Sequence, residues 1–279
     1  MKPESAQYAT GQLRARDRDR YFATLLLAPK EREALAALYA FNADIASVRE
    51  RAREPAAGEI RLQWWADALS GEGHGDVLSN PLADALLSAV AEYGLPIPPL
   101  TRMIAARRFD LYQDPMPDVP TFEGYAGETV SALYQLGAMI LKAGKPVETG
   151  DAAGHLGVAH ALIGHLRAFG YNASQGRIFV PWSVLAANGA VEGELFAGQV
   201  SRGLTAGLTQ LGDMAVDHLN KADVAIRALP RELRTAFAPI ALLRAQHKRL
   251  HPEAPFQRYD DLPDWRKIAA LGWWKLTNA

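Results

Sequence analysis

The chain has 279 residues, of which 49% are hydrophobic, and its 30 basic and 31 acidic residues leave a formal net charge of −1. A chain of this length can bury a large core within one domain, and its near-neutral charge provides no global attraction to nucleic acid or to an anionic bilayer. The sequence contains no cysteine, which excludes disulfides, thiolate nucleophiles and iron–sulfur clusters and favours a cytoplasmic location.

Residues 1–20 form a polar N-terminal segment, in which Arg alternates with Asp between Arg14 and Arg20. No apolar stretch follows this charged run, so a signal peptide is not expected. No segment of the sequence approaches the roughly 18 uninterrupted apolar residues that a membrane span requires. We therefore expect a single main domain over 21–279 and at most peripheral contact with a membrane.

Helical spacing of Ala and Leu recurs through most of the chain, whereas the alternation typical of strands is never sustained. The first strong helix begins after Pro29 and should run to about Arg53. A second helix carries the pair Trp64–Trp65 and should end at the glycine-rich stretch 71–75. Further helices are expected at about 81–93, 97–112, 121–142, 151–169, 201–228, 231–250 and 262–275.

The breaks between these helices contain proline or glycine, and they are typical of turns between helices rather than of linkers between domains. They fall at Pro96–Pro99, Gln113–Pro120, Gly144–Gly150, Leu229–Pro230 and His251–Pro255. No internal repeat suggests a helical solenoid. The sequence therefore predicts an all-α closed helical bundle.

Four segments resemble squalene and phytoene synthases, which condense two prenyl diphosphates head to head. They are LYAFN at 38–42, RFDL at 108–111, YAGETVSALYQLG at 125–137 and GVAHALIGHLRAFGYNASQGRIFVP at 157–181. The resemblance covers roughly residues 20–275 and implies an isoprenoid-synthase-type helical bundle. It also implies substrate-binding roles for Tyr39, Arg167 and Arg177, although Arg177 could equally form a salt bridge that shapes its turn.

In active members of that family, two D-x-x-x-D motifs face each other across the bundle and hold Mg²⁺ ions that bind the substrate diphosphates. Residues i and i+4 share a helix face, so both carboxylates of a motif reach one metal cluster. The resemblance places the first motif at Ala46 and Glu50 and the second at Ala168 and Asn172. Only Glu50 keeps a carboxylate, and Asp110, which matches another family aspartate, is the second weak candidate for a metal ligand.

Nearby positions do not replace the missing acids. Ser47 and Tyr171 stand where further acidic residues are common, and Asp44 lies about 200° round the helix from Ala46. Each carboxylate missing at about 4 Å from a cation forfeits on the order of 4 kcal/mol at an effective dielectric near 20. We therefore expect no cofactor, and Mg²⁺ only if the protein is catalytically active.

The segment 40–65 (AFNADIASVRERAREPAAGEIRLQWW) is similar to the branch of the family that includes a mitochondrial complex I assembly factor. This resemblance implies a non-catalytic protein that binds an isoprenoid lipid or a respiratory complex I assembly partner, in the cytoplasm or peripheral to the inner membrane. The alternative is a head-to-head prenyltransferase that condenses two prenyl diphosphates with Mg²⁺ held by Glu50 and Asp110. A carrier that holds a prenyl lipid without reacting it is a third hypothesis.

Two aromatic segments each allow two interpretations. Arg61, beside Trp64, could line a pocket for a prenyl chain or an anionic head group, or could belong to an amphipathic helix with its tryptophans in the core. The pair Trp273–Trp274, followed by Lys275, could rest at a membrane interface or pack in the core.

Overall fold

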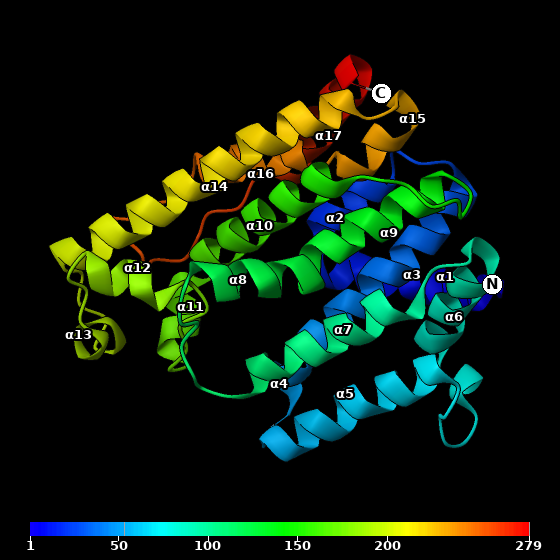
Figure 1. The fold of residues 1–279 in the computed structure, drawn as a ribbon, viewed down its shortest axis with the longest axis horizontal. Coiled ribbons are helices and arrows are strands. Elements are labelled where there is room, and N and C mark those ends of the chain that lie inside the picture. The colour runs from blue at the N-terminus through cyan, green and yellow to red at the C-terminus, as the bar shows by residue number, and fades with distance from the viewer. Residues whose placement is uncertain (53, 279) are drawn as a thin grey trace.

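The computed structural model describes residues 1–52 and 54–278, and every regular element in these ranges is a helix. The longer helices run in roughly the same direction, with α10 beside α14 and α7 beside α5 (Figure 1). In chain order the elements are α1 Pro3–Arg16, α2 Arg18–Thr24, α3 Pro29–Ala46, α4 Val48–Arg51, α5 Pro55–Ser70, η1 Val77–Ser79, α6 Pro81–Tyr93, α7 Ile97–Arg107, η2 Arg108–Leu111, α8 Val119–Ala126, η3 Gly127–Ser131, α9 Ala132–Leu141, α10 Gly150–Arg167, α11 Phe169–Ser174, α12 Trp182–Ala187, α13 Glu192–Phe196, α14 Arg202–Ala228, α15 Arg231–Arg234, η4 Thr235–Phe237, α16 Ile240–His247 and α17 Asp264–Asn278. The all-α prediction is confirmed.

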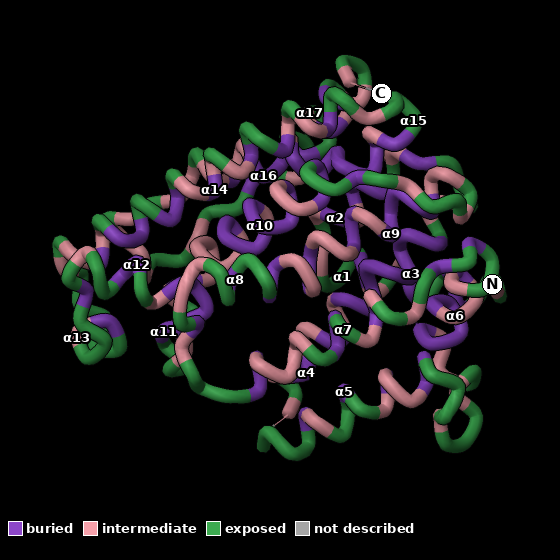
Figure 2. The backbone as a smooth tube through the Cα atoms, viewed as in Figure 1, coloured by how far each residue is buried: buried purple, intermediate pink, exposed green. Residues whose placement is uncertain are grey.

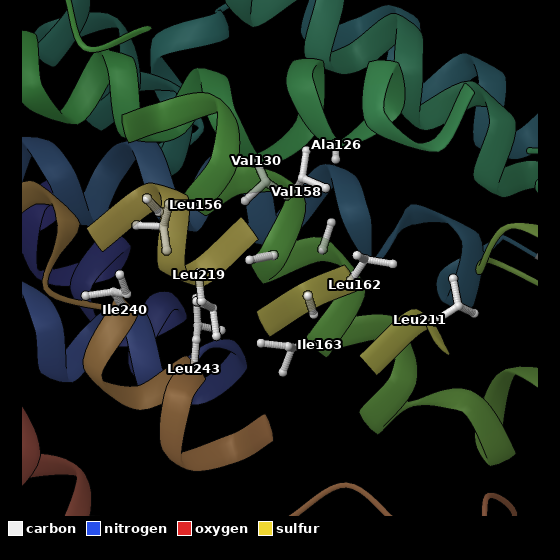
Figure 3. Close-up of a cluster of buried hydrophobic side chains, with 14 of the residues drawn as sticks. Ala126, Val130, Leu156, Val158, Leu162, Ile163, Leu211, Leu219, Ile240 and Leu243 are labelled. Carbon is white, nitrogen blue, oxygen red and sulfur yellow. The ribbon is translucent and has the colours of Figure 1, made fainter. Parts of the chain in front are cut away.

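Two buried apolar clusters hold the bundle together. One joins α10, α14 and α16 through side chains such as Leu162, Leu219 and Ile240 (Figure 3). The other joins α1, α3, α6 and α7. Helix α9 belongs to both, because Tyr134 lies in the first cluster and Leu136 in the second. The buried segments in Figure 2 follow these helices through the middle of the molecule.

The first strong helix differs from its prediction, because the segment expected to be continuous to about Arg53 is interrupted at Ser47, between α3 and α4. The Ser47 hydroxyl donates to the carbonyl oxygen of Asp44 at 2.8 Å, and Arg51 donates to the same oxygen at 2.8 Å. Such side-chain bonds to the backbone compete with helical pairing and terminate the helix. Arg53 itself lies outside the described residues.

Residues 1–20, expected as a polar segment outside the main domain, form α1 and the start of α2. Ala9 and Leu13 of α1 are completely buried, and the helix packs against α3 and α6. The Asp17 side chain caps α2 by accepting a hydrogen bond from the backbone N–H of Arg20 at 3.0 Å. The segment therefore contributes to the bundle, through an apolar face that its charged residues mask in the sequence.

Three other predicted helices are subdivided. The segment 97–112 ends as the 3₁₀ turn η2, and 121–142 contains the π-helical turn η3 between α8 and α9. The segment 231–250 divides into α15, η4 and α16. Pro239 stands just before α16, and because proline has no backbone N–H, it cannot donate the hydrogen bond that would continue the preceding turn into this helix. Within the described ranges, no helix has the length and apolarity needed to span a bilayer.

Helices α10 and η3 approach each other at Gly157, where an added Cβ would lie 2.0 Å from the Ser131 hydroxyl oxygen and 2.6 Å from the Ser131 backbone nitrogen. We expect Gly157→Ala to lower the free energy of unfolding by about 1–3 kcal/mol, because these helices would have to separate. Urea unfolding measures this change. Gly154→Ala on the same helix is the control, since its Cβ would meet nothing within 4 Å. Equal stability of the two variants would contradict the close approach.

Candidate functional site

A cavity of about 620 Å³ lies between α3 and α4 on one side and α10 and α11 on the other. Ala46 and Glu50 line it from the first side, and Ala168 and Asn172 line it from the second. The structure therefore brings together the four positions at which the family resemblance places the two facing D-x-x-x-D motifs. The remaining wall comes from α1, α2, α7, α8 and η3.

The cavity is basic. Among the described residues, five arginines but only two carboxylates, Asp17 and Glu50, belong to its lining. The arginines are Arg16, Arg20, Arg49, Arg51 and Arg107. None of the five was singled out from the sequence.

Asp44 neutralises two of these arginines from outside the cavity. Its carboxylate accepts hydrogen bonds from Arg16 at 3.1 Å, Arg51 at 2.9 Å and the indole N–H of Trp65 at 3.0 Å. It lines a separate surface pocket of about 310 Å³. The orientation expected from its position on the helix, away from Ala46, is the one observed.

Asp110 lies in the wall behind the cavity. One carboxylate oxygen accepts a hydrogen bond from Arg107 at 3.0 Å and the other from the Tyr125 hydroxyl at 2.8 Å, while Arg107 also donates to that hydroxyl at 2.6 Å. Asp110 is buried, and burial raises the pKa of Tyr125. Both oxygens of the predicted metal ligand are therefore engaged by the protein.

Arg20 connects three elements of the cavity wall. It donates to the Asn42 side-chain oxygen at 2.9 Å, and Asn42 donates in turn to the carbonyl oxygen of Thr129 at 3.2 Å, in the π-helical turn η3. Tyr39, a predicted substrate-binding residue, lies in the core with Arg20 over its ring at 5.2 Å. Burial raises the pKa of Tyr39 to about 12. Tyr39 thus supports Arg20 from behind.

Arg49 differs from the other four arginines, each of which has a carboxylate within 3.3 Å. Its ion partner among the described residues is Glu50, at 4.0 Å, and its side chain is only 14% exposed. The guanidinium also lies 3.4 Å from the Asn172 side-chain oxygen and 4.4 Å from the centroid of the Phe179 ring. A cation therefore reaches from α4 to α11, between the two sets of motif positions.

The sequence model of the squalene/phytoene synthases matches residues 13–268. The chain belongs to the squalene/phytoene synthase family. Assembly factor 6 of NADH dehydrogenase (ubiquinone) complex I from Bos taurus is 27% identical over 244 residues, which are 88% of this chain and 73% of that protein. The 15-cis-phytoene synthase of Synechococcus elongatus is 26% identical over 265 residues, 90% of this chain and 86% of that protein.

The fold of this family member is also similar to solved structures. The crystal structure of a dehydrosqualene synthase in complex with ligand aligns with a TM-score of 0.79 at 18% identity, covering 98% of this chain and 96% of that chain. At this identity the likeness establishes the isoprenoid-synthase-type fold alone.

Two of the predicted substrate-binding residues, Arg61 and Arg167, lie away from the central cavity. Arg61 is exposed and lines the surface pocket that also contains Asp44. Arg167 lies 3.4 Å from Asp19 and 3.3 Å from Asp261, with its guanidinium stacked on a tyrosine ring. The structure does not bring either arginine into the lining of the cavity.

Arg177 lines a second cavity, of about 320 Å³, that shares Arg49 with the first. Its Nε atom is buried without a hydrogen-bond partner among the described residues. The salt bridge that could have shaped this turn is not formed within the described part of the chain. Arg177 and Arg49 are therefore the two arginines near the motif positions whose donors are least satisfied.

Two buried histidines, His160 and His165, line the cavity as neutral groups. Burial, reinforced by Arg49 and Arg107, lowers the pKa of His165 from 6.5 to about 3. Burial also lowers the pKa of His160, whose Nδ1 lies 2.8 Å from the Tyr134 hydroxyl. At neutral pH the positive charge of the cavity therefore resides on its arginines.

These lowered pKa values predict a loss of stability in acid. As the pH falls below about 6.5, the unfolded chain binds protons at these histidines that the folded chain does not, so the free energy of unfolding falls. For His165 this fall continues toward pH 3, by about 1.4 kcal/mol per pH unit. We expect His165→Phe to reduce this slope in urea unfolding between pH 7 and 4. His74→Gln, in an exposed loop, should leave the slope unchanged, and an equal effect of both variants would contradict the assignment.

Proposed function

We propose that this family member is a pseudoenzyme that takes part in the assembly of respiratory complex I and holds an anionic isoprenoid lipid in its central cavity. The observation that carries the proposal is the position of Arg49, a nearly buried cation between Glu50 and Asn172. In a metal-dependent synthase the same space would hold Mg²⁺ between carboxylates. Here the protein itself supplies the positive charge.

The side chains around the cavity do not fit Mg²⁺. This ion prefers an octahedron of hard oxygen ligands that includes one or two carboxylates. Glu50 is half exposed and lies beside Arg49, and both oxygens of Asp110 already accept hydrogen bonds. The described residues contain no group of three or more acidic or histidine side chains that could hold a metal. We therefore derive no metal-assisted ionisation step and propose that no cofactor is required.

The cavity suits a phosphate group attached to an apolar chain. A guanidinium donates two parallel hydrogen bonds to phosphate oxygens, and such charge-assisted bonds are the strong ones. Between the arginines, part of the lining is apolar and formed by small side chains such as Ala43, Val130 and Ala161. A prenyl diphosphate could therefore bind through its head group without the metal that would activate it.

The assembly role is supported by relatives whose names state it. Complex I assembly factor 6 proteins from several animals are about as similar to this chain as the cyanobacterial phytoene synthase, at 27% and 26% identity. We place the protein in the cytoplasm, at most peripheral to the inner membrane, where a respiratory complex I assembly partner would be met.

We expect farnesyl diphosphate to bind the pure protein equally well with EDTA and with Mg²⁺, in isothermal titration calorimetry. Arg49→Gln should weaken binding roughly tenfold or more, because a charge-assisted hydrogen bond contributes about 1.5–3 kcal/mol. Arg61→Gln is the matched control, since Arg61 lies outside the cavity and should leave affinity unchanged.

Turnover of a prenyl diphosphate would contradict the proposal. Release of diphosphate with formation of a C30 or C40 product, in the presence of Mg²⁺ and farnesyl or geranylgeranyl diphosphate, would show a prenyltransferase. If Glu50→Ala abolished that turnover, Glu50 would be a metal ligand and the non-catalytic proposal would be wrong.

Deletion of the gene in its host is expected to lower the amount of assembled complex I, measured by native gel electrophoresis and by NADH oxidation in membranes. A Glu50→Ala copy should restore assembly as fully as the wild type, because no metal-dependent step is required. An Arg49→Glu copy, which reverses the charge in the cavity, should not. Unchanged complex I in the deletion strain would refute the assembly role.

A further inference from the structure

Helix α17 has two apolar faces, only one of which the bundle covers. Leu271 and Trp274 point into the core and are almost completely buried. On the opposite side four large apolar side chains are exposed. They are Trp265 (65% exposed), Ile268 (52%), Trp273 (71%) and Leu276 (81%). The Trp273–Trp274 pair is thus split, with one ring in the core and the other in solvent.

The exposed side chains form one continuous stripe. At about 100° per residue, these four positions together with Ala269 and Gly272 fall within an arc of about 140°, and the stripe is about 16 Å long. No charged residue lies in this arc. Arg266 borders it on one side, and Lys275 borders it on the other, next to Asp264, whose carboxylate pairs with Arg18. Apolar residues flanked by cations are the pattern of helices that lie in a membrane interface.

The stripe differs from single exposed apolar residues elsewhere on the molecule. Ile60 on α5 and Tyr171 on α11 are far from each other and from α17 (Figure 1), and single exposed apolar residues are normal on a protein surface. A row of large side chains along one helix marks a contact surface instead. The C-terminal end of helix α17 lies at an edge of the molecule (Figure 1), and exposed positions recur along the helix.

The charges around the stripe indicate what covers it. Arg266 lies 5.2 Å above the Trp265 ring and has no carboxylate within 4.0 Å among the described residues. Lys275 donates to the Leu26 carbonyl and the Thr235 hydroxyl, and no described carboxylate neutralises it. On a second copy of this surface the acid nearest to the stripe would be Asp264, which already pairs with Arg18. Lipid phosphates would offer anions to Arg266 along the edge of the stripe.

We propose that α17 docks the protein on an anionic membrane surface. The tryptophans, which favour the boundary between head groups and acyl chains, enter that boundary with Ile268 and Leu276. Arg266 extends beside them to the lipid phosphates. This docking surface goes beyond the proposed function, because it uses no residue of the central cavity and holds whether or not the cavity binds a lipid.

The test is flotation of the full-length protein with vesicles of phosphatidylcholine and with vesicles in which about a third of the lipid is phosphatidylglycerol. The wild type should float with the anionic vesicles, and less well at high salt. The partition coefficient of the double variant Trp265→Ser/Trp273→Ser onto the anionic vesicles should be lower by about tenfold or more. Arg266→Glu should lose binding to the anionic vesicles.

The matched control is Ile60→Ser/Tyr171→Ser, which removes two exposed apolar side chains from other helices and should float like the wild type. Circular dichroism verifies that each variant is folded. Failure of the folded wild type to float, or an equal loss in the control, would overturn the proposal. If the wild type does not float but forms a dimer, and Trp265→Ser/Trp273→Ser dissociates that dimer, the stripe contacts a second copy of the chain. That result would also overturn the membrane proposal.

Discussion

Compensation of guanidinium charge is the constraint on which the central cavity depends. A buried cation is costly unless a carboxylate or a set of hydrogen bonds satisfies it, and five arginines border the space between the two halves of the bundle. Asp17, Asp44 and Asp110 are each engaged by at least one of them. These acids therefore stabilise the wall. Among the carboxylates that line the cavity, Glu50 has the weaker interactions with the protein.

This arrangement joins the packing of the fold to its chemistry. The Arg107–Asp110–Tyr125 network holds the end of α7 against α8, and the Arg20–Asn42 bond holds α2 against α3. Both networks place guanidinium groups at the rim of one cavity. Under the proposed function, the same charges that the fold must compensate would be the ones that receive an anionic head group. Because the fold is shared with synthases, the site alone carries this argument.

The helices of this protein were predictable where local rules act alone. The helix expected at 81–93 has the bounds of α6. In the structure Asn80 caps its start and Gly94 ends it in a left-handed conformation, both of which are local effects. The interruption at Ser47 was not expected. Its hydroxyl bonds back to the Asp44 carbonyl and also accepts a hydrogen bond from Arg16 of the distant helix α1, so its position is fixed in part by a tertiary neighbour. Helix α1 was missed because its two most buried residues, Ala9 and Leu13, are a weak signal among many polar neighbours.

The sequence by itself determined the all-α fold, the family and the identities of the four residues at the motif positions, because periodicity and motif spacing are local properties of the chain. Only the tertiary structure decided that Arg49 reaches Asn172 and that both carboxylate oxygens of Asp110 accept hydrogen bonds, from Arg107 and Tyr125. It also decided that Trp273 faces solvent while Trp274 faces the core. Each of these facts depends on which distant helix lies opposite a side chain, and that pairing is set by the packing of the whole bundle.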